Sequence, residues 1–159
     1  MKFKILLFAI FLSVFAHAQS NSPKNTFYAE LGGNGLFGSV NYERQLSKSP
    51  GFAVHAGLGF YTENHLFLTI PAGVDILFPL KKKDRYINWG MDMTWASNNG
   101  NFFGQNSLGS RVPHFVSFIP SLGYRSHVKN DLFWRFSFSP VINRYGFVPW
   151  AGFAFGKRF

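Results

Sequence analysis

Apolar and polar side chains alternate along most of this sequence, and the alternation limits the folds that the chain can adopt. It is clearest between Tyr86 and Ala96, where the apolar residues Ile87, Trp89, Met91, Met93 and Trp95 are separated by Asn88, Gly90, Asp92 and Thr94. Successive side chains of a β-strand point to opposite faces, so such a segment has one apolar and one polar face. The repeat of about 3.6 residues that marks an amphipathic helix is absent from residue 19 onward. The sequence therefore predicts an all-β protein.

Eight segments carry this pattern. They are 26–33, 36–46, 52–61, 66–78, 86–96, 114–125, 132–142 and 148–159. Their lengths of 8 to 13 residues exceed the about five or six residues typical of strands in soluble proteins, whereas a tilted strand needs about nine to eleven residues to cross a membrane. We therefore predict a single eight-stranded antiparallel up-and-down transmembrane β-barrel, with apolar faces toward lipid and polar faces toward the interior.

Glycine and proline predict local features of the strands and turns. Gly33, Asn34 and Gly35 separate the first two segments, and this predicts a tight hairpin because these residue types accept positive φ angles. Pro71 and Pro120 lie inside predicted strands. Proline cannot donate to the β-ladder, so we expect a bulge at each of them.

The connection lengths predict the orientation of the barrel. Three short turns, 47–51, 79–85 and 126–131, fall on one side, and the longest connection, 96–114, falls on the other. Outer-membrane barrels have short periplasmic turns and longer external loops. Both ends of the barrel domain are therefore expected on the periplasmic side.

Composition favours a membrane protein over a water-soluble one. Aromatic residues make up 19% of the chain and charged residues 14%, whereas soluble domains average about a quarter charged residues. After the first residues, no run of about eighteen apolar residues could form a membrane helix. The chain has no cysteine, which excludes disulfides, thiolate metal sites and cysteine nucleophiles.

The beginning of the chain has the three parts of a secretory signal peptide. A basic start precedes the apolar run 5–16, and the small residues Ala16 and Ala18 mark a cleavage site. The apolar run is too short to span a membrane. We expect a cleaved signal peptide over 1–18 and an exported barrel domain over 19–159.

The chain resembles the small eight-stranded outer-membrane β-barrel proteins of Gram-negative bacteria, and in particular uncharacterised barrels common in Bacteroidetes. The resemblance lies in the segments "GSVNYERQL", "LTIPAGVDILF", "IPSLGYR" and "VPWAGFAFGKRF". It covers essentially the whole of 19–159. It implies a fold and a location in the bacterial outer membrane, and it implies no reaction.

The C-terminal segment also resembles an assembly signal. Phe159 ends the chain, with Phe153 and Phe155 at alternate positions before it. This resembles the pattern that the outer-membrane barrel-assembly machinery recognises, and it implies that machinery as a partner. Lys157 departs from the pattern, which usually has a hydrophobic residue there; its stem can lie along the barrel while its amine reaches the headgroups.

Eight charged or titratable residues fall on the predicted inward face. They are Glu30, Glu43, His55, Asp75, Asp92, Arg125, Arg135 and Arg158. A barrel of eight strands encloses only enough space for side chains to fill, and an unpaired buried charge is costly. We therefore favour a plug of ion pairs over an open pore, a proton pathway or an active site. Glycines on the same face leave space for these long side chains.

Two other functions stay open. A lipid-modifying outer-membrane enzyme would need a hydroxyl activated by a histidine. The nearest candidates are His114 with Ser117 and Ser126 with His127, and neither has the spacing of two residues that places both side chains on one strand face. A secreted soluble β-barrel that binds a small apolar ligand would need apolar side chains inside and polar ones outside. We expect a non-enzymatic protein of structural or surface-interaction type.

The expected partners are outer-membrane lipid and lipopolysaccharide. The connection 96–114 is the candidate for surface contacts, with Phe102, Phe103 and Arg111 as possible contact residues, because long loops without secondary structure are usually functional or disordered. The net charge is +9, but no nucleic-acid motif accompanies it, so no nucleic-acid partner is expected. The histidines are dispersed, so no metal site is expected, and no cofactor is predicted.

Overall fold

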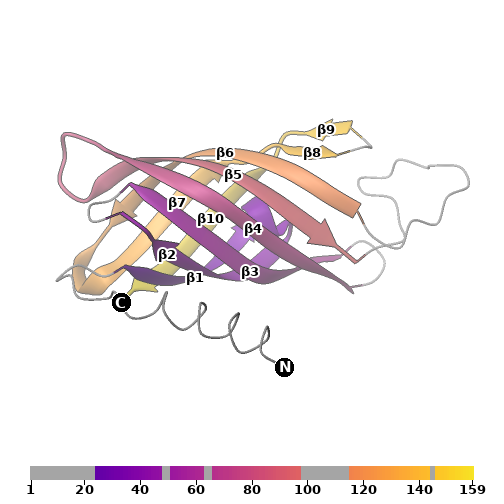
Figure 1. Cartoon of the computed structure of the whole chain (residues 1–159), viewed down its shortest axis with the longest axis horizontal. Helices are drawn as coiled ribbons and strands as arrows, with labels where there is room; N and C mark the ends of the chain where they lie inside the picture. Colours follow the sequence, from indigo (N-terminus) through magenta and orange to yellow (C-terminus); the bar gives the residue numbers. More distant parts are fainter. Residues whose placement is uncertain (1–23, 48–50, 63–65, 98–114, 144–145) are drawn as a thin grey trace, which may run out of the picture.

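The computed structural model describes residues 24–47, 51–62, 66–97, 115–143 and 146–159, which form an antiparallel β-barrel (Figure 1). Its strands are β1 (Asn25–Gly32), β2 (Gly38–Gln45), β3 (Phe52–Thr62), β4 (Leu66–Pro79), β5 (Arg85–Ala96), β6 (Phe115–His127), β7 (Leu132–Phe138), β8 (Val141–Asn143), β9 (Gly146–Val148) and β10 (Ala151–Arg158). The wall runs in the order β5-β4-β3-β2-β1-β10-β7-β6, and β5 also pairs with β6, so that every strand of the wall has two neighbours. The predicted all-β, eight-stranded antiparallel up-and-down barrel is confirmed.

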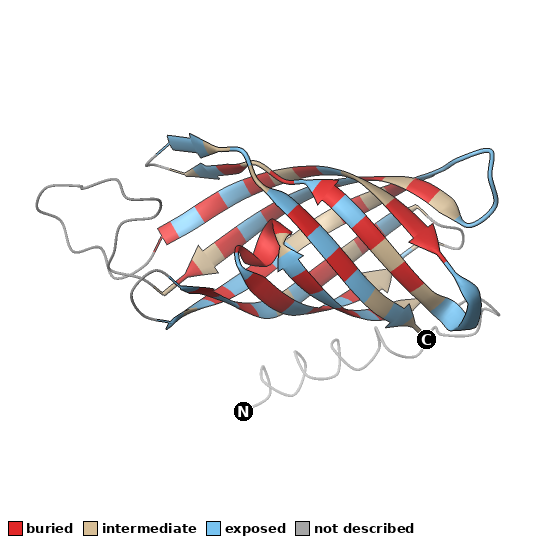
Figure 2. Cartoon of the chain, turned by 180° about the vertical axis from the view of Figure 1, so that it is seen from behind, coloured by how far each residue is buried: buried red, intermediate tan, exposed pale blue. Residues whose placement is uncertain are grey.

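Burial alternates along the wall strands, as the sequence pattern predicts (Figure 2). On β5, Asn88, Asp92 and Thr94 are buried, whereas Met91 and Met93 are 40% and 61% exposed. The same alternation occurs on β1, where Glu30 is buried and its neighbours on the strand face outward. The barrel therefore has a polar interior and an apolar outer face.

A proline interrupts the chain next to each of the last two strands of the wall. Pro140 separates β7 from β8, and Pro149 lies between β9 and β10. The register is the same on both sides of the break, and the Ser139 N–H donates to the Trp150 carbonyl across it, at 2.8 Å. Because proline has no N–H to donate, the ladder is interrupted there. The β8–β9 hairpin continues beyond the break and pairs with β6.

The predicted bulges at Pro71 and Pro120 are wrong. The β3–β4 register is the same on both sides of Pro71, and Pro120 pairs with Met91 in an unbroken β5–β6 register. A proline removes one donor from the ladder, whereas a bulge requires an additional residue on one strand. No residue is inserted at either position.

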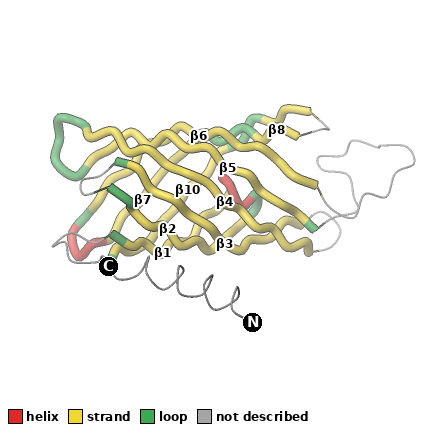
Figure 3. Tube along the Cα trace, in the orientation of Figure 1, coloured by secondary structure: helices red, strands yellow, loops and turns green. Residues whose placement is uncertain are grey.

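The predicted hairpin between the first two strands is present, with the Gly32 N–H bonded to the Phe37 carbonyl at 2.8 Å, but its turn folds inward. The 3-10 turn η1 (Gly33–Gly35) contacts β1, β2, β3, β4, β5 and β10, and Figure 3 shows it within the outline of the barrel. Gly33, Asn34 and Gly35 are buried, and Leu36 is 1% exposed. Gly33 has a φ of 62°, and a Cβ on it would lie 2.5 Å from Glu30 Cδ. Glycine is therefore needed because η1 folds into the barrel, not because the turn is exposed.

The start of β1 and the end of β10 lie side by side at one end of the barrel, which we call the terminal end. Asn25 and Phe159 exchange two backbone hydrogen bonds there, at 3.1 and 2.8 Å. The turn after β6 includes the short helix η3 (Lys129–Asp131). We call the opposite end, where β5 ends and β6 begins, the loop end. No helix in the described ranges is long and apolar enough to cross a membrane.

Candidate functional site

Inward-facing charged side chains from seven strands meet inside the barrel. Seven of the eight residues of the predicted interior cluster are buried: Glu30, Glu43, His55, Asp75, Asp92, Arg125 and Arg135. Each comes from a different strand, β1 to β7 in chain order. Closure of the barrel therefore brings together residues that lie far apart in sequence. We call these seven residues the interior network.

Arg135 lies at the centre of the interior network. Its Nη2 is 2.9 Å from Glu30 Oε1, and its Nη1 is 3.5 Å from Asp75 Oδ2. The guanidinium carbon also lies 5.1 Å from the ring centroid of Tyr28. One buried cation thus serves two carboxylates on different strands, and this links β7 to β1 and β4.

His55 lies between two carboxylates. Its Nδ1 is 2.9 Å from Asp75 Oδ2, an ion-pair distance without hydrogen-bond geometry, and its Nε2 is 2.5 Å from Asp92 Oδ1. Asn88 Nδ2 donates to the other oxygen of Asp75, at 2.6 Å. Asp75 therefore has polar neighbours on three strands.

A second ion pair lies beside the aromatic ring of Phe133. Arg125 Nη1 is 2.8 Å from Glu43 Oε2, and Arg125 Nε donates to His127 Nε2 at 3.1 Å. The guanidinium carbon lies 4.1 Å from the Phe133 ring centroid. Thr26 Oγ1 donates to the other oxygen of Glu43 at 3.4 Å.

Arg158 lies apart from the other seven predicted residues. Its Nη2 is 3.2 Å from Asp131 Oδ1, and the two side chains are 19% and 48% exposed. Asp131 belongs to η3, in the turn at the terminal end. Arg158 is therefore part of the rim and does not balance the buried carboxylates.

The backbone of η1 and the following residue is held inside the barrel by side chains of the wall. Thr94 Oγ1 donates to the Asn34 carbonyl at 2.6 Å, and Thr69 Oγ1 donates to the Gly35 carbonyl at 2.9 Å. Trp150 Nε1 donates to the Leu36 carbonyl at 3.0 Å. We call residues 33–36 the plug segment. All four of its carbonyl groups accept a hydrogen bond although they are buried, the Gly33 carbonyl from the Leu36 N–H at 3.3 Å.

The plug segment is connected to the interior network by a carboxylate. The Asn34 N–H donates to Glu30 Oε2 at 3.3 Å, while Glu30 Oε1 faces Arg135. Glu30 therefore contacts a cation on one side and the plug segment on the other. The sequence pattern shows Glu30 on the inward face but contains no signal for this second contact.

An apolar cluster lies inside the barrel at the loop end, and the sequence pattern did not predict it. Its buried members are Leu36, Tyr61, Ala96, Phe115, Ile119 and Val141, with Phe67, Val148 and Trp150 packed against them. The sequence signal that could have predicted this cluster is the presence of large apolar residues at several inward positions near the loop end. Together with the plug segment, the cluster lies between the ion pairs and the loop end of the barrel.

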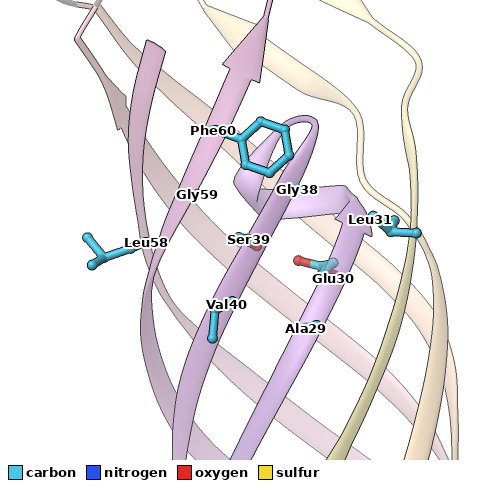
Figure 4. A pocket seen from close by; sticks show the side chains of 9 residues that line it. All are labelled: Ala29, Glu30, Leu31, Gly38, Ser39, Val40, Leu58, Gly59 and Phe60. Carbon is cyan, nitrogen blue, oxygen red and sulfur yellow. The ribbon is translucent and has the colours of Figure 1, made fainter. Parts of the chain in front are cut away.

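A shallow hollow lies on the outer side of β1, β2 and β3. It has a volume of about 350 Å³. Its lining consists of Ala29, Glu30, Leu31, Gly38, Ser39, Val40, Leu58, Gly59 and Phe60 (Figure 4). Leu31 and Leu58 are 69% and 61% exposed, whereas Glu30 and Ser39 are buried. The hollow is thus an indentation of the apolar outer face and is distinct from the polar interior.

Of the two hydroxyl–histidine candidates, only Ser126 with His127 lies wholly within the described residues, and it forms no hydrogen-bonded pair there. Ser117 is buried, and its Oγ accepts from Asn143 Nδ2 at 3.4 Å. His127 Nε2 accepts from Arg125, not from Ser126. His114 lies outside the described residues, as do Phe102, Phe103 and Arg111 and the predicted signal peptide. Within the described ranges, no group of three or more His, Cys, Asp or Glu side chains could hold a metal ion.

The three phenylalanines of the predicted assembly signal lie on the outer face. Phe153, Phe155 and Phe159 are 46%, 51% and 61% exposed. Phe153 and Phe155 pair with Leu31 and Ala29 of β1, so they lie at the seam where the barrel closes.

Comparison with known proteins gives a structural match without a sequence match. No family model and no curated protein matches the chain. The crystal structure of the N-terminal β-barrel domain of Pseudomonas aeruginosa OprF is similar, with a TM-score of 0.62 over 88% of this chain and 98% of that chain. The sequence identity is 12%. This similarity concerns the fold and carries no residue roles.

Proposed function

We propose that the chain is an integral bacterial outer-membrane β-barrel protein of structural or surface-interaction type, with a side-chain-filled interior and no open pore. The observation that carries the proposal is the apolar outer face around a polar interior. Exposed residues on this face include Leu31, Met93 and Phe136 at 69%, 61% and 56%. Continuous apolar surface of this kind is unfavourable in water and favourable against lipid. The fold of the OprF barrel domain is consistent with this location.

Cell fractionation with a heat-modifiability gel tests the location. The mature protein is expected in the outer-membrane fraction, and the folded barrel is expected to migrate differently before and after boiling. A soluble periplasmic product would contradict the proposal. The rival soluble barrel needs apolar side chains inside, whereas the described interior contains four carboxylates and two guanidinium groups.

We propose no enzymatic activity for this protein. The support is that neither candidate pair has the spacing of two residues that places both side chains on one strand face, that His127 Nε2 accepts from Arg125, and that the buried ionic groups pair with one another. A lipid-modifying activity would appear as altered lipid A or phospholipid in cells that express the protein. A change in lipid that is lost on replacing His114 or Ser117 by alanine would overturn this part of the proposal.

Channel recordings test the closed interior. In planar bilayers, we expect the wild-type protein to give no steady conductance. Replacing Thr69 and Thr94 together by valine removes two hydrogen bonds to the plug segment. Each buried carbonyl left without a donor costs about 1–3 kcal/mol. The double variant is therefore expected to open transiently more often than the wild type, whereas a steadily conducting wild type would contradict a closed barrel.

The C-terminal residue is proposed to take part in recognition by the assembly machinery. Phe159→Ser is expected to lower the amount of folded barrel in the outer membrane, measured by heat-modifiability. Phe147→Ser is the matched control, because Phe147 and Phe159 are 62% and 61% exposed and Phe147 lies in the β8–β9 hairpin, outside the closed wall. Equal losses in the two variants would count against a specific signal.

The surface partner proposed for this barrel is lipopolysaccharide, together with the surrounding outer-membrane lipid. Support comes from the apolar outer face and from aromatic side chains such as Trp89, which is 38% exposed. The similarity of the quoted segments to Bacteroidetes barrels stays a prediction that none of these observations tests. Identification of the lipids that co-purify with the protein from outer membranes would test the lipopolysaccharide contact.

A further inference from the structure

The buried charges of the interior do not balance. The interior network contains four carboxylates, those of Glu30, Glu43, Asp75 and Asp92, but only two guanidinium groups, on Arg125 and Arg135. Its remaining member that can be positively charged is His55. Even a charged His55 leaves the network with one negative charge too many. An uncompensated buried charge is strongly unfavourable, so one further positive charge is required.

The contacts of His55 suit a positively charged imidazolium ring. Each of its ring nitrogens faces a carboxylate oxygen, of Asp75 on one side and Asp92 on the other. An ionised carboxylate only accepts hydrogen bonds, and the unprotonated oxygen of a neutral carboxyl group accepts them too, so His55 can carry hydrogen on both ring nitrogens whether Asp92 is ionised or is protonated on Oδ2. A neutral imidazole would raise the deficit from one charge to two.

Three of the four carboxylates are well served by donors. Asp75 has the Asn88 amide at 2.6 Å and Arg135 at 3.5 Å in addition to His55. Glu30 has Arg135 and the Asn34 N–H. Glu43 has Arg125 at 2.8 Å and the Thr26 hydroxyl at 3.4 Å. Every oxygen of these three carboxylates therefore has a hydrogen-bond donor or a cationic neighbour.

Asp92 is different. Its Oδ1 faces His55 Nε2, but its Oδ2 is buried and has no hydrogen-bond partner among the described residues. The residue is 1% exposed, so bulk water cannot solvate the oxygen. Elsewhere in the interior, Asn88 Oδ1 and Ser121 Oγ are also without partners in the described structure. An oxygen lacking donors in such a position favours the neutral acid over the anion.

We infer that the barrel interior contains a binding site for a single proton, on the Asp92 carboxyl group, and that this proton completes the charge balance of the network. The groups that face Asp92 are His55 from β3, Asp75 from β4, Arg135 from β7 and Glu30 from β1. With Asp92 neutral, the two arginines and His55 balance Glu30, Glu43 and Asp75. This inference concerns the interior alone and does not depend on the proposed location or surface role.

Infrared spectroscopy of the purified, folded full-length protein in detergent micelles tests the inference. A protonated carboxyl group has a C=O stretch that ionised carboxylates lack. At neutral pH, the wild type is expected to show this band, and Asp92→Asn is expected to lose it. Asp131→Asn is the control, because Asp131 is an exposed partner of Arg158 at the rim, and its band should match the wild type. The wild-type spectrum is decisive even if Asp92→Asn fails to fold, because absence of the band overturns the inference.

Unfolding in urea gives a second readout. Asparagine has the shape of a neutral aspartic acid and keeps an acceptor for His55, so the midpoint of Asp92→Asn is expected to equal that of the wild type or exceed it. A large fall in the midpoint would show that the ionised carboxylate is required, and would overturn the inference. A wild-type midpoint that rises in sodium chloride but not in choline chloride of equal ionic strength would also overturn it, since a metal cation would then supply the missing charge.

Discussion

Arg135→Met is expected to destabilise the barrel by about 3–5 kcal/mol, because removing one partner of a buried ion pair leaves an uncompensated charge. Arg135 is 2% exposed, and it contacts both Glu30 and Asp75. Methionine keeps much of the side-chain volume, so the loss reflects mainly the missing charge. The measurement is urea unfolding of the refolded protein in lipid vesicles, followed by circular dichroism.

Two further variants show whether this loss is electrostatic. Arg158→Met removes the rim ion pair with Asp131, where both side chains are partly exposed, and pairs of this kind contribute about 0–1 kcal/mol. Adding Glu30→Gln to Arg135→Met removes one of the stranded carboxylates and is expected to recover part of the stability. If Arg135→Met and Arg158→Met were equally stable, a central role for Arg135 would be excluded.

Gly156→Val is expected to prevent the closure of the barrel. Gly156 pairs with Tyr28 across the β1–β10 seam. A Cβ at this position would lie 2.3 Å from the Phe27 carbonyl oxygen and 2.7 Å from Tyr28 Cα. These are backbone atoms of a neighbouring strand and cannot rotate away. Overpacking of well-packed cores costs about 1–3 kcal/mol and occasionally more, and we expect the upper part of that range or loss of folding.

The matched control for the seam is Ala151→Val. Ala151 lies on the same strand, but it is exposed on the outer face, so an enlarged side chain there points away from the interior. Heat-modifiability and circular dichroism should show a folded barrel for Ala151→Val and little or none for Gly156→Val. Normal folding of Gly156→Val would mean that the seam between the first and last strands is looser than the structure shows.

The sequence was sufficient to place the buried charges but not to pair them. Glu30, His55 and Arg135 lie at alternate, inward positions of their strands, and this follows from a period of two residues. Which carboxylate contacts which cation depends on the register of the strands, because the register sets how far along the barrel axis each side chain lies. Arg158 illustrates the difference: it shares the inward pattern, but its position at the end of β10 brings it to Asp131 at the rim.

The plug segment shows a second limit of sequence reasoning. Gly33, Asn34 and Gly35 suit an exposed tight turn and an inward fold equally well, because both require positive φ angles or the absence of a side chain. The choice depends on donors that lie far along the chain. Thr69, Thr94 and Trp150 donate to the carbonyls of Gly35, Asn34 and Leu36, over separations of 34, 60 and 114 residues. No local pattern contains those contacts.

The alternation of side chains was enough to predict the all-β class, the eight strands and the polar interior, because strand geometry places every second residue on the same face. Only the folded chain shows that the first connection turns inward, that an apolar cluster lies at the loop end and that His55 lies between Asp75 and Asp92. Those features arise from strand register and barrel closure, which bring together residues that the linear pattern keeps apart. The same closure buries one negative charge more than the cations of the interior can balance.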